Sequence, residues 1–240
     1  TNTSGGSTTG NTVSITGLDT GMRVQKRDGS FEPVNVNKIV KAVQKHSVGL
    51  QYVDPMLIAT KTISGLYNGT STQELDKLAI RTASTMTVDE PQYSKLAARL
   101  LVTYIDKEVK NQDIYSFSQC ISTGYELGLY SEKVYTFVRT NARKLNSFID
   151  TARNDLFEYF GVATLYDRYL TKHSKTRKVI ETPQYFWLRV ACGLSKSVEE
   201  AKELYQLFSS LEYIPSSPTL FNSGTCHEQM SSCYLLDSPE

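Results

Sequence analysis

Apolar residues recur at intervals of three and four along most of this 240-residue chain. That spacing places them on one face of a helix, so it predicts a series of amphipathic helices rather than an extended sheet. The segments with this spacing include residues 39–43, 75–82, 96–104, 115–129, 132–145 and 198–211. We therefore expect a mainly α-helical fold, with its dense Tyr, Phe and Trp side chains packed in the core.

A short region near the N-terminus is the exception, because residues 23–36 alternate about Asp28-Gly29. Asp-Gly between alternating residues is a strong β-hairpin signal, so two short antiparallel strands are expected there. Four helices should follow: one N-capped by Asn37, one from Asp54-Pro55 to about Tyr67, one capped by Thr72 and one opened by Pro91. A second hairpin is expected from residues 165–170 and 177–180.

The composition is that of a soluble globular chain, with 40% hydrophobic and 21% charged residues. A formal net charge of +1 argues against nucleic acid or a membrane surface as the main partner. No apolar run approaches the roughly 18 residues that span a bilayer. The first twelve residues are only Thr, Asn, Ser and Gly, so residues 1–21 are expected to form a flexible tail, with a short strand at 13–17.

The four cysteines and three histidines show no spacing that suits a metal site. Few cysteines in a chain of this length indicate a reduced protein, so a cytoplasmic location is expected. Cys120 and Cys192 lie in apolar helical stretches and should be buried. Cys226 precedes Cys233 by seven residues, at which spacing a disulfide within the loop is conceivable.

Lys26, Arg27 and Lys38 gather near the hairpin turn and the start of the first helix. Cations and helix N-terminal amides both favour a polyphosphate, so this cluster could form a phosphate site. A solvated basic face explains the same spacing, and no glycine-rich phosphate loop favours the first interpretation.

The second candidate is the polar segment 216–233, which ends in Ser232-Cys233 and passes into the apolar run Tyr234–Leu236. That run predicts a strand. A thiol at the head of a strand could be held rigidly against a ligand, with the preceding hydroxyl and amide groups binding an anion. From the residue types alone, a structural cysteine in an ordinary loop is the more common case.

Longer motifs favour the functional interpretation of both candidates. The segment 24–39 resembles the signature of the ATP-cone, Val-x-Lys-Arg-Asp-Gly-x-x-Glu-x-Val-x-x-x-Lys-Ile. Two later segments resemble the large catalytic subunit of class I ribonucleotide reductase: Ser-Pro-Thr-Leu-Phe-Asn-Ser-Gly at 217–224 and Met-Ser-Ser-Cys-Tyr-Leu-Leu at 230–236. Three helical-region motifs resemble the same family: 144–147, 159–165 and 181–184. The resemblance implies an ATP-cone of a small hairpin plus four helices at 22–112, a helical domain at 113–211 and the first part of a ten-stranded α/β barrel at 212–240.

The resemblance also implies site residues. Cys233 would be one of two thiols that reduce the substrate and end as a disulfide, and Ser217, Thr219 and Ser232 would lie against the substrate nucleotide. The cone would bind ATP or dATP, with Mg, as an allosteric regulator. Its contacts would be Lys26, Arg27, Glu32, Asn35, Asn37, Lys38, Thr72, Asp76 and Lys107.

The implied chemistry is the reduction of a ribonucleoside diphosphate by a radical delivered from a small metal-bearing subunit, since this chain carries no metal centre of its own. Thioredoxin or glutaredoxin would restore the thiols, and the subunit would form homo-oligomers. The radical-bearing cysteine, the second reducing cysteine and the rest of the barrel would lie beyond Glu240. We therefore expect a piece of a split reductase or of a longer one, inactive alone. Two alternatives are a non-catalytic nucleotide-sensing module and a helical interaction protein.

Overall fold

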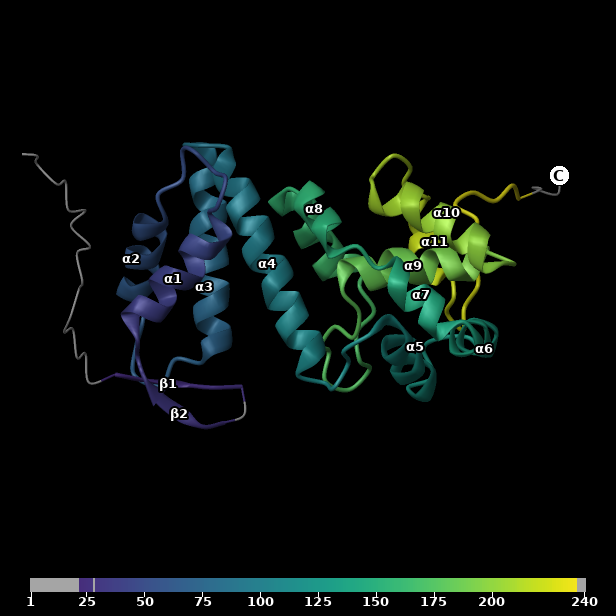
Figure 1. Cartoon of the computed structure of the whole chain (residues 1–240), viewed down its shortest axis with the longest axis horizontal. Coiled ribbons are helices and arrows are strands. Elements are labelled where there is room, and N and C mark those ends of the chain that lie inside the picture. Colours follow the sequence, from purple (N-terminus) through teal and green to yellow (C-terminus); the bar gives the residue numbers. More distant parts are fainter. Residues whose placement is uncertain (1–21, 28, 237–240) are drawn as a thin grey trace, which may run out of the picture.

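The computed structural model describes residues 22–27 and 29–236. The tail and short strand expected within residues 1–21 lie outside this range, as does Asp28 of the expected turn. The molecule is elongated, with the hairpin and α1–α4 at one end and α5–α11 at the other (Figure 1). No helix in the described ranges is long and apolar enough to cross a membrane.

The helices of the first half are α1 Val36–His46, α2 Pro55–Ser64, α3 Thr72–Thr85 and α4 Gln92–Lys110. Those of the second half are α5 Phe117–Glu126, α6 Glu132–Thr140, α7 Ala142–Phe148, α8 Tyr159–Thr164, α9 Pro183–Leu194, α10 Val198–Ser209 and α11 Ser217–Asn222. Short 3₁₀ turns cover Met86–Val88 and Thr151–Leu156, and a π-helical turn covers Leu165–Tyr169. The expected fold, mainly helical with a small hairpin, is confirmed.

The hairpin pairs β1 Arg23–Gln25 with β2 Phe31–Pro33 in antiparallel register, Val24 opposite Glu32. Gly29 has φ +86°, a left-handed conformation that glycine adopts without strain. The other edge of β1 is hydrogen-bonded to the loop before α3, because the amide of Gln25 donates to the carbonyl of Thr70 at 3.0 Å. The hairpin is thereby fixed beside the start of α3.

Two expected helix caps are wrong by one or two residues. Asn35, not Asn37, caps α1: its backbone is extended and its side chain accepts from the amide of Lys38 at 3.0 Å. Asn37 is the second residue of α1, whereas the capping residue is the extended residue just before the helix begins. Similarly, Ser71 rather than Thr72 caps α3, in a reciprocal capping box with Glu74.

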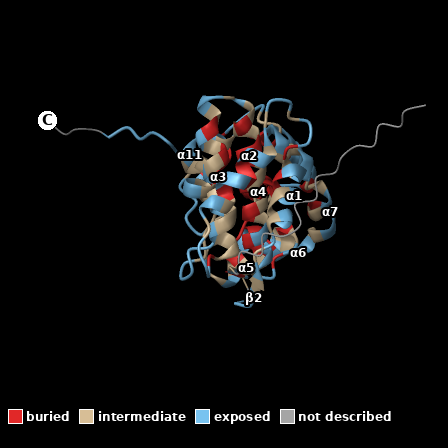
Figure 2. Cartoon of the chain, turned by 90° about the vertical axis from the view of Figure 1, so that its left-hand side faces the viewer, coloured by how far each residue is buried: buried red, intermediate tan, exposed pale blue. Residues whose placement is uncertain are grey.

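Helix α4 lies between the two halves of the molecule (Figure 1) and carries many of the buried residues (Figure 2). Leu96 and Ala97 pack in the core of the N-terminal helices with Val43, Ile58 and others. Further along, Leu101 and other α4 residues join the larger core of the second half. One helix thus contributes buried side chains to both cores.

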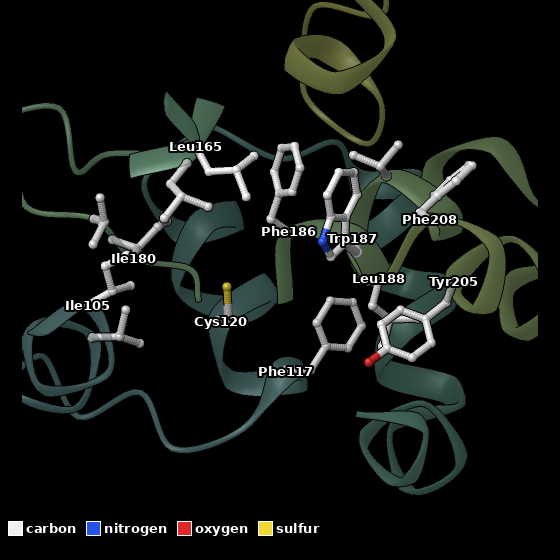
Figure 3. Close-up of a cluster of buried hydrophobic side chains, with 14 of the residues drawn as sticks. Ile105, Phe117, Cys120, Leu165, Ile180, Phe186, Trp187, Leu188, Tyr205 and Phe208 are labelled. Atoms are coloured by element: carbon white, nitrogen blue, oxygen red, sulfur yellow. The ribbon is translucent and has the colours of Figure 1, made fainter. Parts of the chain in front are cut away.

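The larger core is built around α9, whose residues Phe186, Trp187 and Leu188 are buried (Figure 3). Helices α5 and α10 pack against it. Cys120 of α5 and Cys192 of α9 are buried free thiols, as expected. Burial raises the pKa of both thiols, which keeps them protonated and unreactive.

Three other expectations are wrong. The segment expected as one helix over 132–145 breaks at Asn141 into α6 and α7, because Asn141 leaves helical geometry with φ −113° and ψ 17°. Residues 165–169 form the π-helical turn instead of the first strand of the expected second hairpin. Antiparallel pairing occurs a few residues later, as an isolated bridge of Lys172 with Val179. Tyr234–Leu236 is exposed and forms no strand, since no neighbouring strand in the described ranges offers it hydrogen-bond partners.

Candidate functional site

A pocket of about 170 Å³ opens between β2, α1, α3 and α4. The hairpin, fixed beside α3, forms one wall, and Lys107 in the last turn of α4 lines another side. Its lining residues are Val24, Glu32, Val34, Asn35, Lys38, Ile39, Ala42, Thr72, Leu75, Asp76 and Lys107. The lining combines apolar side chains with charged ones, as a site for an amphiphilic ligand requires.

Glu32 of β2 holds two cations at the mouth of this pocket. Its carboxylate contacts the ammonium of Lys26 at 2.9 Å and that of Lys38 at 3.1 Å. The hydrogen bond from Lys26, followed by that from Lys38, lowers the pKa of Glu32, so the carboxylate stays ionised at neutral pH. All three groups are exposed enough that these pairs contribute little to stability. Both lysines can therefore be redirected to an anionic ligand at small cost.

Asp76 of α3 likewise holds two cations. It accepts from Lys107 of α4 at 3.0 Å and from Arg27 at 3.4 Å. The guanidinium of Arg27 also lies over the ring of Tyr104, 5.2 Å from its centroid. The four cations and two carboxylates of the site leave a formal charge of +2, counted as 4 − 2. That surplus favours a polyanion such as a triphosphate.

Apolar side chains line the rest of the pocket, among them Ile39 and Ala42 of α1 and Leu75 of α3. These three also line a smaller adjoining cavity of about 60 Å³ that contains His46 and Thr103. An apolar wall beside a cationic rim suits a ligand with a flat ring at one end and phosphates at the other.

The structure brings most of the expected nucleotide contacts together. Six line the pocket: Glu32, Asn35, Lys38, Thr72, Asp76 and Lys107. Lys26 and Arg27 line a neighbouring groove, which Thr72 shares. Asn37 is exposed and lines neither hollow. The sequence interpretation missed the apolar lining, although the inward spacing of Ile39 on α1 was a signal for it.

The second candidate segment is organised by α11. The Ser217 hydroxyl lies 2.9 Å from that of Tyr169, and the Thr219 hydroxyl donates to the carbonyl of Met230 at 3.2 Å. Ser232 and Cys233 are exposed, and the Ser232 hydroxyl lies 3.8 Å from the thiol. The hydroxyls of α11 are thus ordered by contacts, whereas Ser232 and Cys233 lie in the exposed chain beyond it. Cys226 and Cys233 are both free thiols.

Within the described residues, no group of three or more His, Cys, Asp or Glu side chains is arranged to hold a metal ion.

Comparison with known proteins matches each of these two regions to a known domain family. Residues 22–108 match the ATP cone domain, and residues 155–228 match the all-alpha domain of ribonucleotide reductase. The chain therefore contains an ATP cone domain and a ribonucleotide reductase all-alpha domain. The pocket between β2, α1, α3 and α4 lies within the ATP cone match, and α11 lies within the all-alpha domain match.

Curated relatives carry the name ribonucleoside-diphosphate reductase large subunit. That of Caenorhabditis elegans is 41% identical over 226 residues, which cover 90% of this chain and 28% of the relative. That of Arabidopsis thaliana is 38% identical over 227 residues, 90% of this chain and 27% of the relative. The Vaccinia virus protein is 39% identical over 225 residues, 90% of this chain and 29% of the relative. The chain thus spans under a third of the length of these relatives.

Proposed function

We propose that this chain is the N-terminal portion of a ribonucleoside-diphosphate reductase large subunit, and that its ATP cone binds ATP or dATP, with Mg, to regulate reduction. The single observation that carries this proposal is the pocket in which Lys38, Lys107 and Asp76 surround an apolar wall. A cationic rim with a formal surplus of charge matches the triphosphate, and the apolar wall matches the base.

The roles of individual residues follow from their positions. Lys26, Arg27, Lys38 and Lys107 would contact the triphosphate, exchanging their carboxylate partners for phosphate oxygens. Thr72 and Asp76 would lie near the ribose and base, and Glu32 and Asn35 at the pocket mouth would complete the contacts. For Asn37, only the family motif supports a contact with the nucleotide. We assign the cone to residues 22–112, the helical domain to 113–211 and the start of the barrel to 212–240.

The catalytic part of the proposal concerns α11 and the chain after it. Ser217, Thr219 and Ser232 would hold the substrate diphosphate, and Cys233 would be one of two thiols that supply the electrons. Loss of the substrate 2′ hydroxyl as water takes two electrons, which leave the thiols as a disulfide. The exposure of Cys233 supports this role, because the substrate and the second thiol must both reach it.

Further polypeptide is required for this chemistry. The remaining barrel would supply the second thiol, a small subunit would supply the radical, and thioredoxin or glutaredoxin would reduce the disulfide. We place the assembly, a homo-oligomer of large subunits with its small subunit, in the cytoplasm.

A non-catalytic nucleotide sensor is the second candidate, and the cone pocket alone would support it. The ordered hydroxyls of Ser217 and Thr219 favour catalysis, since a sensor has no use for them.

Reconstitution of activity tests the proposal. Reduction of a ribonucleoside diphosphate should require this chain, a polypeptide with the remaining barrel and a radical-generating subunit together, and ATP should increase the rate. Cys233→Ser should abolish turnover, whereas Cys226→Ser, at the other exposed free thiol, serves as the matched control. Turnover by this chain alone, or full activity of Cys233→Ser, would contradict the proposal.

A further inference from the structure

A buried ion pair contacts the end of α11, within the segment 216–233 to which we assign substrate binding; we call this the substrate segment. Glu181 comes two residues before α9 and Arg189 lies within that helix, and neither side chain is exposed at all. Two contacts join them: Nε of Arg189 to one carboxylate oxygen at 2.9 Å, and Nη2 to the other at 3.0 Å. This fork-to-fork geometry fixes the plane of the guanidinium.

Glu181 is itself held from three other directions. Its carboxylate accepts from the Tyr130 hydroxyl at 3.1 Å, and from both the amide and the hydroxyl of Thr171 at 2.8 Å. Five hydrogen bonds therefore converge on one buried carboxylate. Burial alone would lower the pKa of Arg189, but the charge and hydrogen bonds of Glu181, together with the nearby Tyr130 and Cys120 side chains, outweigh it and hold that pKa above its ordinary value.

The remaining donors of Arg189 point to the C-terminal end of α11. Nη1 donates to the carbonyl of Ser223 at 2.7 Å, and Nη2 also reaches the carbonyl of Leu220 at 3.5 Å. Carbonyls at a helix end lack partners within the helix, so a cation there replaces the missing donors. Arg189 thus links α9 to the last turn of α11.

The backbone after α11 lies directly against α9 at this point. A Cβ on Gly193 would come within 2.2 Å of the Ser223 hydroxyl and 2.4 Å of the Gly224 amide. The Ser223 hydroxyl donates to the carbonyl of Val190 at 2.8 Å. Gly224 has φ +78°, and its carbonyl accepts from the amide of Ser131 at 3.1 Å. Small residues therefore allow the close approach that brings these carbonyls to Arg189.

A buried ion pair gives little net stability, because desolvation of both charges offsets their attraction. An apolar pair of the same volume would serve the core as well. Two apolar side chains, however, could not hold two backbone carbonyls at set positions. The value of this pair therefore lies in geometry.

We propose that Arg189, oriented by Glu181, is a positioning residue for the substrate segment. By fixing the last turn of α11, it fixes the Ser217 and Thr219 hydroxyls and the direction in which the chain leaves toward Cys233. This inference rests on the proposed function for its catalytic consequence, and it assigns Arg189 no contact with substrate.

Two measurements on the same variants test it. In Arg189→Lys, one ammonium cannot bridge the carboxylate and both carbonyls. The amides of Leu220 and Ser223 should then exchange hydrogen about tenfold faster in this chain, with exchange in α1–α3 unchanged. In the reconstituted reductase, kcat should fall about 100-fold, while ATP affinity stays at the wild-type value. Arg99→Lys, which alters an exposed arginine–carboxylate pair elsewhere, is the matched control and should leave α11 exchange unchanged.

A double variant separates positioning from stability. Glu181→Gln/Arg189→Met leaves no unpaired buried charge, so its Tm should exceed that of Arg189→Met alone. Positioning predicts that the double variant still shows fast α11 exchange and a low kcat. Wild-type exchange and kcat in both Arg189→Lys and the double variant would overturn the inference. If the wild-type mixture shows no turnover, the proposed function fails, and the exchange data still decide whether Arg189 positions α11.

Discussion

The phenol oxygen of Tyr169 lies 2.9 Å from the hydroxyl oxygen of Ser217. The ring of Tyr169 also stacks on that of Phe221, with centroids 4.5 Å apart and planes 8° from parallel. The π-helical turn that ends at Tyr169 therefore contacts both the first turn and the last residues of α11. The direction of the Ser217 hydroxyl is set by a residue 48 positions earlier in the chain.

Tyr169→Phe should remove the hydrogen bond that orients the Ser217 hydroxyl, while α11 stays folded. The ring stack remains and one neutral hydrogen bond is lost, so the free energy of unfolding should fall by about 1 kcal/mol. Thermal denaturation measures this change, and the KM of the reconstituted reductase for its diphosphate substrate should rise. Tyr52→Phe, at an exposed ring in the cone, is the control. An unchanged KM would show that the Tyr169 contact does not orient Ser217.

Gly193→Ala should be strongly destabilising, because the new Cβ would lie 2.2 Å from the Ser223 hydroxyl and 2.4 Å from a backbone amide. Overpacking of this kind costs roughly 1–3 kcal/mol, which urea denaturation would measure. Gly161 is the matched helical glycine, since a Cβ there meets only a ring carbon of Phe157, at 3.8 Å. Gly161→Ala should be neutral or stabilising by up to about 1 kcal/mol. Equal effects of the two substitutions would mean that the 223–224 backbone is free to move away from α9.

Protonation of His46 should lower the stability of the fold as the pH falls. Burial, and then the charges of Lys45, Lys107 and Arg99, lower its pKa from the ordinary 6.5, whereas Asp76 raises it slightly. The unfolded chain therefore binds the proton more tightly, so this contribution is present above about pH 6.5 and is lost as the pH falls below it.

The measurement is Tm at pH 7.5 and pH 5.5. His46→Gln stays neutral throughout, so the difference between the two Tm values should be smaller than in the wild type. His227→Gln, at an exposed histidine, should leave the difference as it is. A His46→Gln variant with the full wild-type difference would show that other groups cause the acid sensitivity.

Lys107→Met should weaken ATP binding about tenfold, since one charge-assisted contact to phosphate is lost. The dependence of affinity on salt concentration should also become shallower, because fewer charges attract the ligand. Lys110→Met, one turn further along α4 and exposed, is the control for the loss of one lysine. Equal affinity in both variants would remove Lys107 from the proposed site.

Local sequence signals predicted the elements well where the signal and the structure involve neighbouring residues. Asp54 caps α2 and Pro55 begins it as expected. The caps of α1 and α3 were misplaced because Asn35 and Asn37, like Ser71 and Thr72, can all cap a helix, and the backbone conformation decides between them. The break at Asn141 was hidden because apolar spacing continues across it.

Contacts between distant segments could not be predicted in this way. The family resemblance implied that Lys26, Asp76 and Lys107 belong to one site, but their pairing depends on how the hairpin packs on α3 and α4. Nothing local indicated that Glu181 and Arg189 would be buried together, since charged residues in a sequence are usually exposed. The run Tyr234–Leu236 has strand-like residues, but a strand also needs a neighbour.

The central claim is that the cone binds a nucleotide through its cations. Calorimetric titration of ATP and dATP into this chain, and into its Lys26→Ala/Arg27→Ala variant, tests that claim most directly. Lys133→Ala/Lys144→Ala removes two exposed cations from α6 and α7 and controls for net charge. The account predicts micromolar binding that the control variant retains and the cone variant loses. The absence of binding to the wild-type chain, or equal binding by both variants, would contradict it.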